Sequence, residues 1–246
     1  MDNTAYKVKE SKLTKRLKKL DNTTPLSEEA LPKRNGLIWI LCGRKGSSKT
    51  TVLMNSLKTR QSHGGYKGFF NNIYICSPSM ERDTKTSKLV EEVKRDGNFY
   101  DTINNDVLTE IIDKIKDYND SFEPEEGQTQ PYNLLILDDC LALLPKSNTK
   151  NAVFNSLCLN CRHLKLSIFI TAQKLKGLST VVRSNTDMIS MFRTDNNSEK
   201  NDFMQEFACP EGLYQYCTSE PYSFVHITFT SGKPIYFKKF DRVESA

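Results

Sequence analysis

The stretch LIWILCGRKGSSKT, residues 37–50, decides the fold of this chain. Its first six residues form an unbroken apolar run, which is typical of a strand covered on both faces of a parallel sheet. The remainder nearly matches the phosphate-binding loop G-x-x-x-x-G-K-[ST], in which backbone N–H groups and a helix N-terminus converge on an anion. A helical pattern follows at 49–60. We therefore predict a strand, a phosphate-binding loop and a helix.

The residues of this loop are expected to hold the phosphates of a nucleotide. The glycines allow a wrapped backbone that aims several N–H groups at one anion. The lysine would reach the β- and γ-phosphates, and Thr50 would place its hydroxyl on Mg²⁺. The expected nucleotide-binding residues are Gly43, Arg44, Lys45, Gly46, Ser47, Ser48, Lys49, Thr50 and Thr51.

Ser48 departs from the motif, because it stands where the second glycine belongs. A Cβ at this position crowds the phosphates, although the small hydroxyl could donate a hydrogen bond to a phosphate oxygen. Taken alone, the loop also fits an ordinary Gly/Ser turn before a helix.

A second motif favours nucleotide binding. The segment NLLILDDC, residues 133–140, is an apolar strand that ends in two carboxylates. A carboxylate at such a strand tip can hold Mg²⁺ directly or through water, and we assign this role to Asp138. The neighbouring Asp139 could orient and activate the water that attacks the γ-phosphate.

The order of the strands predicts where a third site residue lies. One predicted strand, 72–76, separates the loop strand from the strand that carries the two aspartates. We expect an additional strand between those two in space, and SIFITAQ, residues 167–173, is the candidate. It would carry Gln173 to the carboxyl edge of the sheet, where ligands of α/β proteins collect. A glutamine there can sense the γ-phosphate or align the water, and the alternative is a polar strand end.

The remaining pattern predicts an α/β fold with a mainly parallel sheet and helices on both faces. Further strands are expected at 166–171 and 187–192, and helices at 84–95, 106–118 and 148–163. After about residue 195 we expect one short helix and then an antiparallel hairpin formed by YSFVHITF and PIYFKKF. We divide the chain into a basic arm, 1–35, and a P-loop ATPase domain, 36–246, whose extension begins at about 196.

Composition sets broad limits. The chain has 246 residues, a net charge of +5 and a pI of about 8.7, which permits a nucleic-acid partner without requiring one. Nine Lys/Arg and five Asp/Glu residues lie in 1–35, so this arm either is a solvated tail or contacts a partner. We expect no membrane span and no secretory signal.

The seven cysteines indicate a reducing compartment. Cys158 and Cys161 form a C-x-x-C pair near His163, but no second pair follows at zinc-finger spacing. We favour packing of a helix over a zinc site for this pair.

Taken together, three segments resemble the FtsK–HerA superfamily of DNA-pumping ATPases. They are GRKGSSKT, LLILDDC and NCRHLKLSIFITAQ, and VVRSNTDMISMF is similar to a further family segment. Within the superfamily, the chain most resembles genome-packaging ATPases of poxvirus-like large DNA viruses and of virophages. The resemblance covers about residues 36–195, and Ser48 and Asp139 are its departures.

The resemblance implies a homo-oligomeric ring, a hexamer or pentamer, with ATP and Mg²⁺ at each interface and double-stranded DNA through the centre. Such a ring needs a cation from the neighbouring subunit. Arg162 is the first candidate, Arg183 the second, and Arg193 a weaker one. A viral capsid or portal vertex is the implied partner, and a viral factory in the host cytoplasm, or the virion, is the implied location.

A DNA pump should contact phosphates and not base edges. Four lysines could project toward a pore: Lys146, Lys150, Lys174 and Lys176. Each of them could instead be an ordinary solvated lysine. Two alternatives to a packaging motor remain at this point. One is a helicase or phosphotransferase on the same core, and the other is a nucleotide-gated scaffold without turnover.

Overall fold

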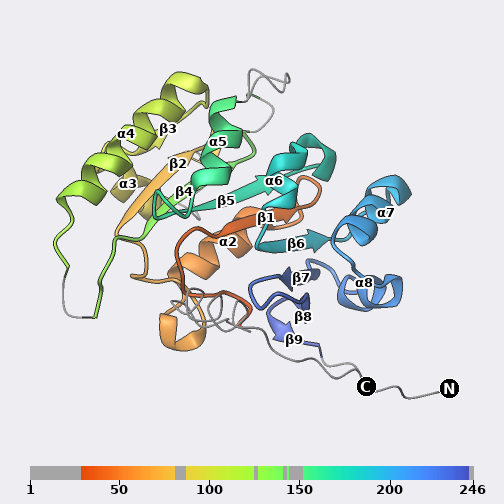
Figure 1. Cartoon of the computed structure of the whole chain (residues 1–246). Coiled ribbons are helices and arrows are strands. Elements are labelled where there is room, and N and C mark those ends of the chain that lie inside the picture. Colours follow the sequence, from red (N-terminus) through yellow and green to blue (C-terminus); the bar gives the residue numbers. More distant parts are fainter. Residues whose placement is uncertain (1–28, 81–86, 125–126, 141–142, 144–151, 244–246) are drawn as a thin grey trace, which may run out of the picture.

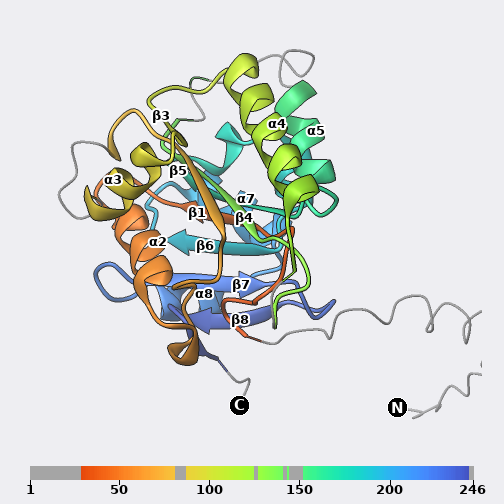
Figure 2. The same ribbon diagram turned by 90° about the vertical axis from the view of Figure 1, so that its left-hand side faces the viewer.

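The computed structural model describes residues 29–80, 87–124, 127–140, 143 and 152–243. Within these ranges a nine-stranded sheet runs through the molecule, with helices packed on both of its faces (Figures 1 and 2). In chain order the strands are β1 (Ile38–Cys42), β2 (Asn72–Cys76), β3 (Phe99–Tyr100), β4 (Asn133–Asp138), β5 (Leu166–Ala172), β6 (Met188–Phe192), β7 (Phe224–Thr228), β8 (Ile235–Lys238) and β9 (Asp241–Arg242).

The strand order in space is β3-β2-β4-β5-β1-β6-β7-β8-β9. The first six strands are parallel to their neighbours, and the last three are added antiparallel. Strand β5 lies between β1 and β4, which confirms the predicted additional strand. Its register places Thr171 beside Asp138 on one side, and Ala172 beside Cys42 on the other. The phosphate loop and the aspartate pair therefore both lie at the carboxyl edge of the sheet.

The helices form two layers because successive strand residues point to opposite faces. Trp39 and Leu41 of β1 pack in the core under α2 and α3, while Ile38 and Ile40 pack in the core on the opposite face. The first layer contains α2 (Lys49–Lys58) and α3 (Ser87–Arg95). The second contains α4 (Asn105–Ser121), α5 (Ala152–Asn160), α6 (Thr180–Ser184), α7 (Asn197–Glu206) and α8 (Glu211–Cys217). Figure 2 shows the sheet between these layers.

Most elements agree with the sequence-based predictions, with differences near the ends. The prediction of one helix after residue 195 was wrong, because both α7 and α8 precede β7. The two-residue strand β3 and the short helix α6 were not predicted, because neither is long enough to show a periodic pattern. The first residues of the helices predicted at 84–95 and 148–163 lie outside the described part of the chain.

The residues that lead into β1 pack against the sheet. Leu31 is buried in the core under α2, and Arg34 pairs with Asp187 at 2.6 Å. Residues 1–28 of the predicted basic arm lie outside the described residues, so the division into arm and domain stays a prediction. Both Cys158 and Cys161 are buried in the core around α5, and burial raises the pKa of Cys161 to about 11.

A chain of buried hydrogen bonds links β1, β6 and β7 to the segment before β1. The indole N–H of Trp39 donates to Ser190 Oγ at 3.0 Å, and Ser190 Oγ lies 2.8 Å from His226 Nδ1. The other ring nitrogen of His226, Nε2, lies 2.7 Å from the carbonyl oxygen of Ala30. A neutral histidine with its proton on Nε2 gives every group in this series of hydrogen bonds a suitable donor or acceptor. Burial lowers the pKa of His226 to about 4, which agrees with that neutral form.

Candidate nucleotide-binding site

The predicted phosphate loop joins the carboxyl end of β1 to the N-terminus of α2. Its first amide, Gly43 N–H, donates to Ala172 O at 3.0 Å and so fixes the start of the loop to β5. Gly46 adopts φ 80°, a left-handed conformation that a glycine takes without steric cost. The N–H groups in the first turn of α2 have no carbonyl of their own helix to bind, so they face the loop as potential anion donors.

Ser48 adopts a left-handed backbone conformation, which a glycine takes without steric cost. It is the N-cap of α2 with φ 73° and ψ 21°, and its side chain makes no capping hydrogen bond. A residue with a Cβ adopts this left-handed conformation at a cost of about 1–2 kcal/mol. The loop therefore carries backbone strain at Ser48, and the Ser48 hydroxyl makes no hydrogen bond to the helix cap.

Lys49 lies at the centre of the loop and is only 5% exposed. Its ammonium group donates to the carbonyl oxygens of Gly43 and Arg44 at 2.8 and 3.0 Å. The loop thus surrounds the charge that the motif assigns to the phosphates. Nearby, the hydroxyl of Ser47 is buried and has no hydrogen-bond partner in the part of the chain that the structure describes, so it is a further potential donor in the loop.

Asp138, at the tip of β4, is the point where the two motifs meet. Its Oδ1 accepts hydrogen bonds from Thr50 Oγ1 at 2.9 Å and Thr171 Oγ1 at 2.8 Å, and its Oδ2 accepts one from Ser77 Oγ at 3.1 Å. Burial raises the pKa of Asp138 above its usual value, and the hydrogen bonds from Thr171 and Thr50 oppose this shift. The predicted metal pair, Thr50 and Asp138, is therefore in direct contact.

Asp139 follows with a strained backbone and an unused carboxylate oxygen. Its φ is 49°, and its N–H donates to Thr171 Oγ1 at 3.0 Å, so Thr171 contacts both aspartates. Among the described residues, its Oδ1 is buried without a hydrogen-bond partner. Buried carboxylate oxygens are normally paired, and unpaired ones gather at sites that bind water, ions or substrates.

Gln173 is exposed directly after β5, between the strands that carry the loop and the aspartates. The chain after it is held by Glu199 of α7, whose Oε1 accepts the N–H of Leu175 at 3.1 Å and lies 3.9 Å from Cys42 Sγ. The other oxygen of Glu199 accepts a hydrogen bond from Thr194 Oγ1 at 3.3 Å. One carboxylate therefore links the ends of β1, β5 and β6.

The two arginines proposed as trans-acting cations lie away from this cluster. Arg162 precedes β5 and pairs with Asp187, which also accepts the N–H of Ile38, at the amino edge of the sheet. Its side chain is 68% exposed. Arg183 is 17% exposed and binds Glu206 through Nε at 2.8 Å. Neither serves the loop of its own chain, so a role for either requires a neighbouring subunit.

The basic residues around the site differ in exposure and pairing. In the loop, Lys45 is exposed, and Arg44 pairs with Asp195 at 3.2 Å. Lys174 is exposed next to Gln173, whereas Lys176 pairs with Asp202 at 2.7 Å. The other two candidate DNA contacts, Lys146 and Lys150, lie outside the described residues. Arg193 is 68% exposed and lies 3.7 Å from Asp195.

Three residues of the site were missed by the sequence analysis: Ser77, Thr171 and Glu199. Ser77 directly follows β2, and Thr171 stands within the TAQ tripeptide that was used only to place Gln173. A hydroxyl residue at the carboxyl end of each strand next to the aspartate strand was the available signal. No comparable signal pointed to Glu199, which lies on a helix beyond the predicted resemblance.

In the part of the chain that the structure describes, no group of three or more His, Cys, Asp and Glu side chains could hold a metal ion. None of the helices in those ranges is long and apolar enough to cross a membrane.

Comparison with solved structures identifies the fold. The genome packaging NTPase B204 from Sulfolobus turreted icosahedral virus 2, in complex with ATPγS, superposes with a TM-score of 0.59 and 20% identity, covering 85% of this chain and 98% of that chain. B204, the DNA-packaging ATPase from Sulfolobus turreted icosahedral virus, gives a TM-score of 0.59 and 18% identity over 87% of this chain and 100% of that chain. The fold is that of P-loop NTPases, and the predicted resemblance is confirmed at this level.

Curated relatives are also viral. The uncharacterized protein 015R of Frog virus 3 is 23% identical over 177 residues, which is 71% of this chain and 50% of that protein. The uncharacterized protein L437 of Acanthamoeba polyphaga mimivirus is 23% identical over 183 residues, which is 69% of this chain and 56% of that protein. The chain therefore spans about half the length of the curated relatives that it matches. No protein-family model matches the chain.

Proposed function

We propose that this chain, which has the fold of a P-loop NTPase, hydrolyses ATP to move double-stranded DNA into a viral capsid. The observation that carries the proposal is the 2.9 Å hydrogen bond between Thr50 of the phosphate loop and Asp138 of β4. It joins the two motifs that would hold the triphosphate, in a fold shared with packaging ATPases of viruses. The curated relatives, which are viral proteins, support a role in a virus.

The residues present fit Mg²⁺. This ion is usually held by one or two protein oxygens together with phosphate oxygens and waters, so a larger cluster of acidic ligands is not needed. The Thr50 hydroxyl and the Asp138 carboxylate supply such a pair, and Ser77 and Thr171 fix the orientation of the carboxylate. When bound, Mg²⁺ would neutralise charge on the β- and γ-phosphates.

Hydrolysis requires a group that accepts a proton from the attacking water. In this step the water oxygen bonds to the γ-phosphorus, the bond from that phosphorus to the bridging oxygen of ADP breaks, and the water proton passes to a carboxylate. We assign the carboxylate to Asp139, because it follows Asp138 directly and one of its oxygens is buried without a hydrogen-bond partner among the described residues. Gln173 would orient the water or contact the γ-phosphate.

The proposal includes a homo-oligomeric ring, a hexamer or pentamer, in which a neighbouring subunit supplies an arginine to the γ-phosphate. Both arginines pair with a carboxylate of their own chain, and Arg162 remains the first candidate because its side chain is 68% exposed, whereas that of Arg183 is 17% exposed. Exposed lysines such as Lys174 would contact DNA phosphates without reading sequence. The capsid or portal vertex would be the docking partner, in the viral factory or the virion.

The test is the ATPase rate of the purified chain with and without linear duplex DNA at low salt, together with the mass of the assembly. We expect duplex DNA to stimulate turnover, and Lys49→Ala or Asp138→Asn to lower kcat at least a hundredfold. Lys116→Ala, which removes an exposed lysine of α4, is the matched control and should behave as wild type.

The outcomes separate the proposal from its alternatives. Turnover that duplex DNA does not stimulate would overturn the packaging motor in favour of another P-loop enzyme. A strand-separation assay and a phosphotransfer screen would then distinguish a helicase from a phosphotransferase. Tight ATP binding with turnover no faster than that of the Lys49 variant would indicate a nucleotide-gated scaffold.

A further inference from the structure

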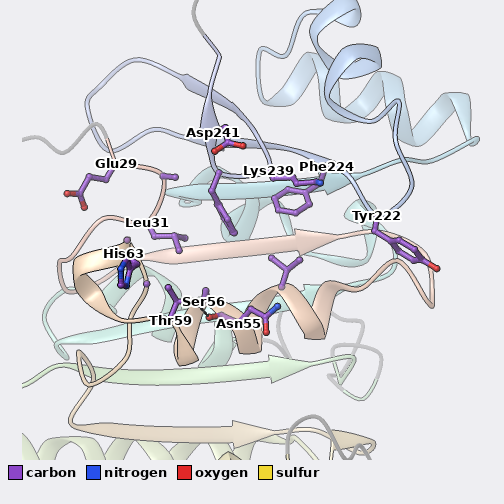
Figure 3. Close-up of a pocket in the computed structure, with 15 residues that line it drawn as sticks. Glu29, Leu31, Asn55, Ser56, Thr59, His63, Tyr222, Phe224, Lys239 and Asp241 are labelled. Atoms are coloured by element: carbon purple, nitrogen blue, oxygen red, sulfur yellow. Dashed lines mark hydrogen bonds between the residues drawn. The ribbon is translucent and has the colours of Figure 1, made fainter.

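A cavity of about 680 Å³ lies alongside α2, the helix that begins with Lys49 (Figure 3). Val52 and Asn55 line it from the helix, Phe224 lines it from β7, and Phe240 lines it from the turn between β8 and β9. Cavities of this size hold small organic ligands, and they are usually apolar with a few polar groups. The nucleotide site described above involves only phosphates, so it leaves this cavity unexplained.

One end of the cavity adjoins the phosphate loop. Val52 is three residues after Lys49, which corresponds to about 4.5 Å along the helix axis. Phe224 lies at the start of β7, opposite Phe192 at the end of β6, and the two ring centroids are 4.8 Å apart. A Cβ added to Gly43 would lie 2.8 Å from Phe192 Cβ, so the loop runs directly against this aromatic wall.

Tyr222 marks the end of the cavity nearest the loop. It precedes β7, which starts at the carboxyl edge of the sheet, and Figure 3 shows it at the end opposite His63 and Glu29. Its side chain is 67% exposed, more than any other large hydrophobic residue in the described part of the chain. Its φ of 59° is a left-handed conformation that is costly for a non-glycine residue.

We propose that this end of the cavity is the nucleoside subsite and that the ring of Tyr222 stacks on the base of ATP. Val52 and Phe224 form the apolar wall against which the base and ribose lie. Stacking of a planar base on an exposed aromatic ring strengthens binding whatever the base, because every base has a π-face. The inference rests on the proposed function, because the phosphates must first be held by the loop.

The phosphate site and the nucleoside subsite can be tested separately. Calorimetry would measure the binding of ATP and of inorganic tripolyphosphate, both with Mg²⁺. We expect Tyr222→Ala to weaken ATP about tenfold and to leave tripolyphosphate unchanged. Tyr222→Phe should bind ATP as wild type does, because the stacking face is retained. Tyr216→Ala is the matched control, since it removes another exposed tyrosine, at 58%, whose ring contacts Lys238.

A spectroscopic readout provides a second measurement. The chain has a single tryptophan, Trp39, which is fully buried, so a Tyr222→Trp variant adds one exposed indole. ATP should quench the fluorescence of this indole, and tripolyphosphate should not.

Three results would overturn the inference. Tyr222→Ala that binds ATP as wild type does would remove Tyr222 from the nucleoside subsite and leave the phosphate site standing. Equal weakening of ATP and tripolyphosphate in that variant would show that Tyr222 shapes the loop and does not contact the base. A wild-type chain that binds neither ligand would overturn the phosphate site, and the subsite with it.

Discussion

At the scale of single residues, the loop shows how a motif tolerates a departure. Ser48 stands at the position of the motif's second glycine and adopts a left-handed conformation, φ 73°, that favours glycine. The backbone around it still wraps Lys49, whose ammonium contacts two loop carbonyls. The substitution therefore stores strain at the N-terminus of α2 and leaves the lysine in place.

Ser48→Gly should relieve this strain and raise the free energy of unfolding by about 1 kcal/mol. ATP affinity should be retained or increase, because a Cβ is removed from the loop. Ser48→Ala separates the two contributions, since it keeps the strain and deletes the hydroxyl. Denaturant unfolding measures the change in stability, and ATP titration measures the change in affinity. A Ser48→Gly variant less stable than wild type would contradict the inference that Ser48 is strained.

The residues that the sequence predicted at the site share one property. Lys49, Thr50 and Asp138 stand in contiguous motifs, where spacing along the chain fixes spacing in the structure. Ser77 and Thr171 contact Asp138 only because β2 and β5 both flank β4 in the sheet. Isolated hydroxyl residues at strand ends have no sequence pattern of their own, so their role depends on strand order and register.

At the scale of elements, β5 is the part that couples the two halves of the site. It lies between β1 and β4, and its residue Thr171 donates to Asp138 and accepts from the N–H of Asp139. The strand was predicted from its place in the chain, but its coupling role required the register.

Thr171→Val keeps the shape of the buried side chain and removes both hydrogen bonds. We expect kcat to fall about tenfold and the free energy of unfolding to fall by about 1–3 kcal/mol, because a buried carboxylate and a buried N–H lose a partner. ATPase kinetics and denaturant unfolding are the measurements.

Ser167→Ala is the control on the same strand. Its hydroxyl is also buried, but it accepts from Leu37 N–H at the far edge of the sheet. We expect this variant to lose stability without losing turnover per folded molecule. Equal losses of turnover in the two variants would show that Thr171 acts only through the stability of β5.

At the scale of the whole molecule, His226 connects parts of the chain that are distant in sequence. Its ring lies between Ser190 of β6 and the carbonyl of Ala30, and Ser190 in turn accepts from Trp39 of β1. The alternation of strands and helices predicted the parallel sheet, and the hairpin pattern of YSFVHITF and PIYFKKF predicted the antiparallel addition. Neither pattern could predict this internal connection, because a histidine in an alternating strand shows neither its burial nor its partners.

Stability should depend on pH through His226. Its pKa is about 4 in the folded chain and about 6.5 when unfolded, so the unfolded state takes up a proton first as the pH falls. This stabilisation is present above pH 6.5 and is lost on acidification toward pH 4, by about 3 kcal/mol in total.

The measurement is denaturant unfolding between pH 7 and pH 4 in wild type and in His226→Gln. The free energy of unfolding should fall less steeply with decreasing pH in the variant, because glutamine does not titrate. The acidic residues contribute equally to the pH dependence of both proteins. His63→Gln, which changes an exposed histidine, should follow wild type. A His226→Gln profile parallel to that of wild type would contradict the assignment.

The outermost strands of the sheet, β3 and β9, have only two residues each in the described part of the chain. A long free strand would offer a ladder of backbone donors and acceptors on which another polypeptide could extend the sheet. Strands this short offer almost no such ladder. Copies of this chain that associate would therefore contact one another through side chains of helices and loops. Such an interface can rearrange without breaking the backbone hydrogen bonds of either sheet.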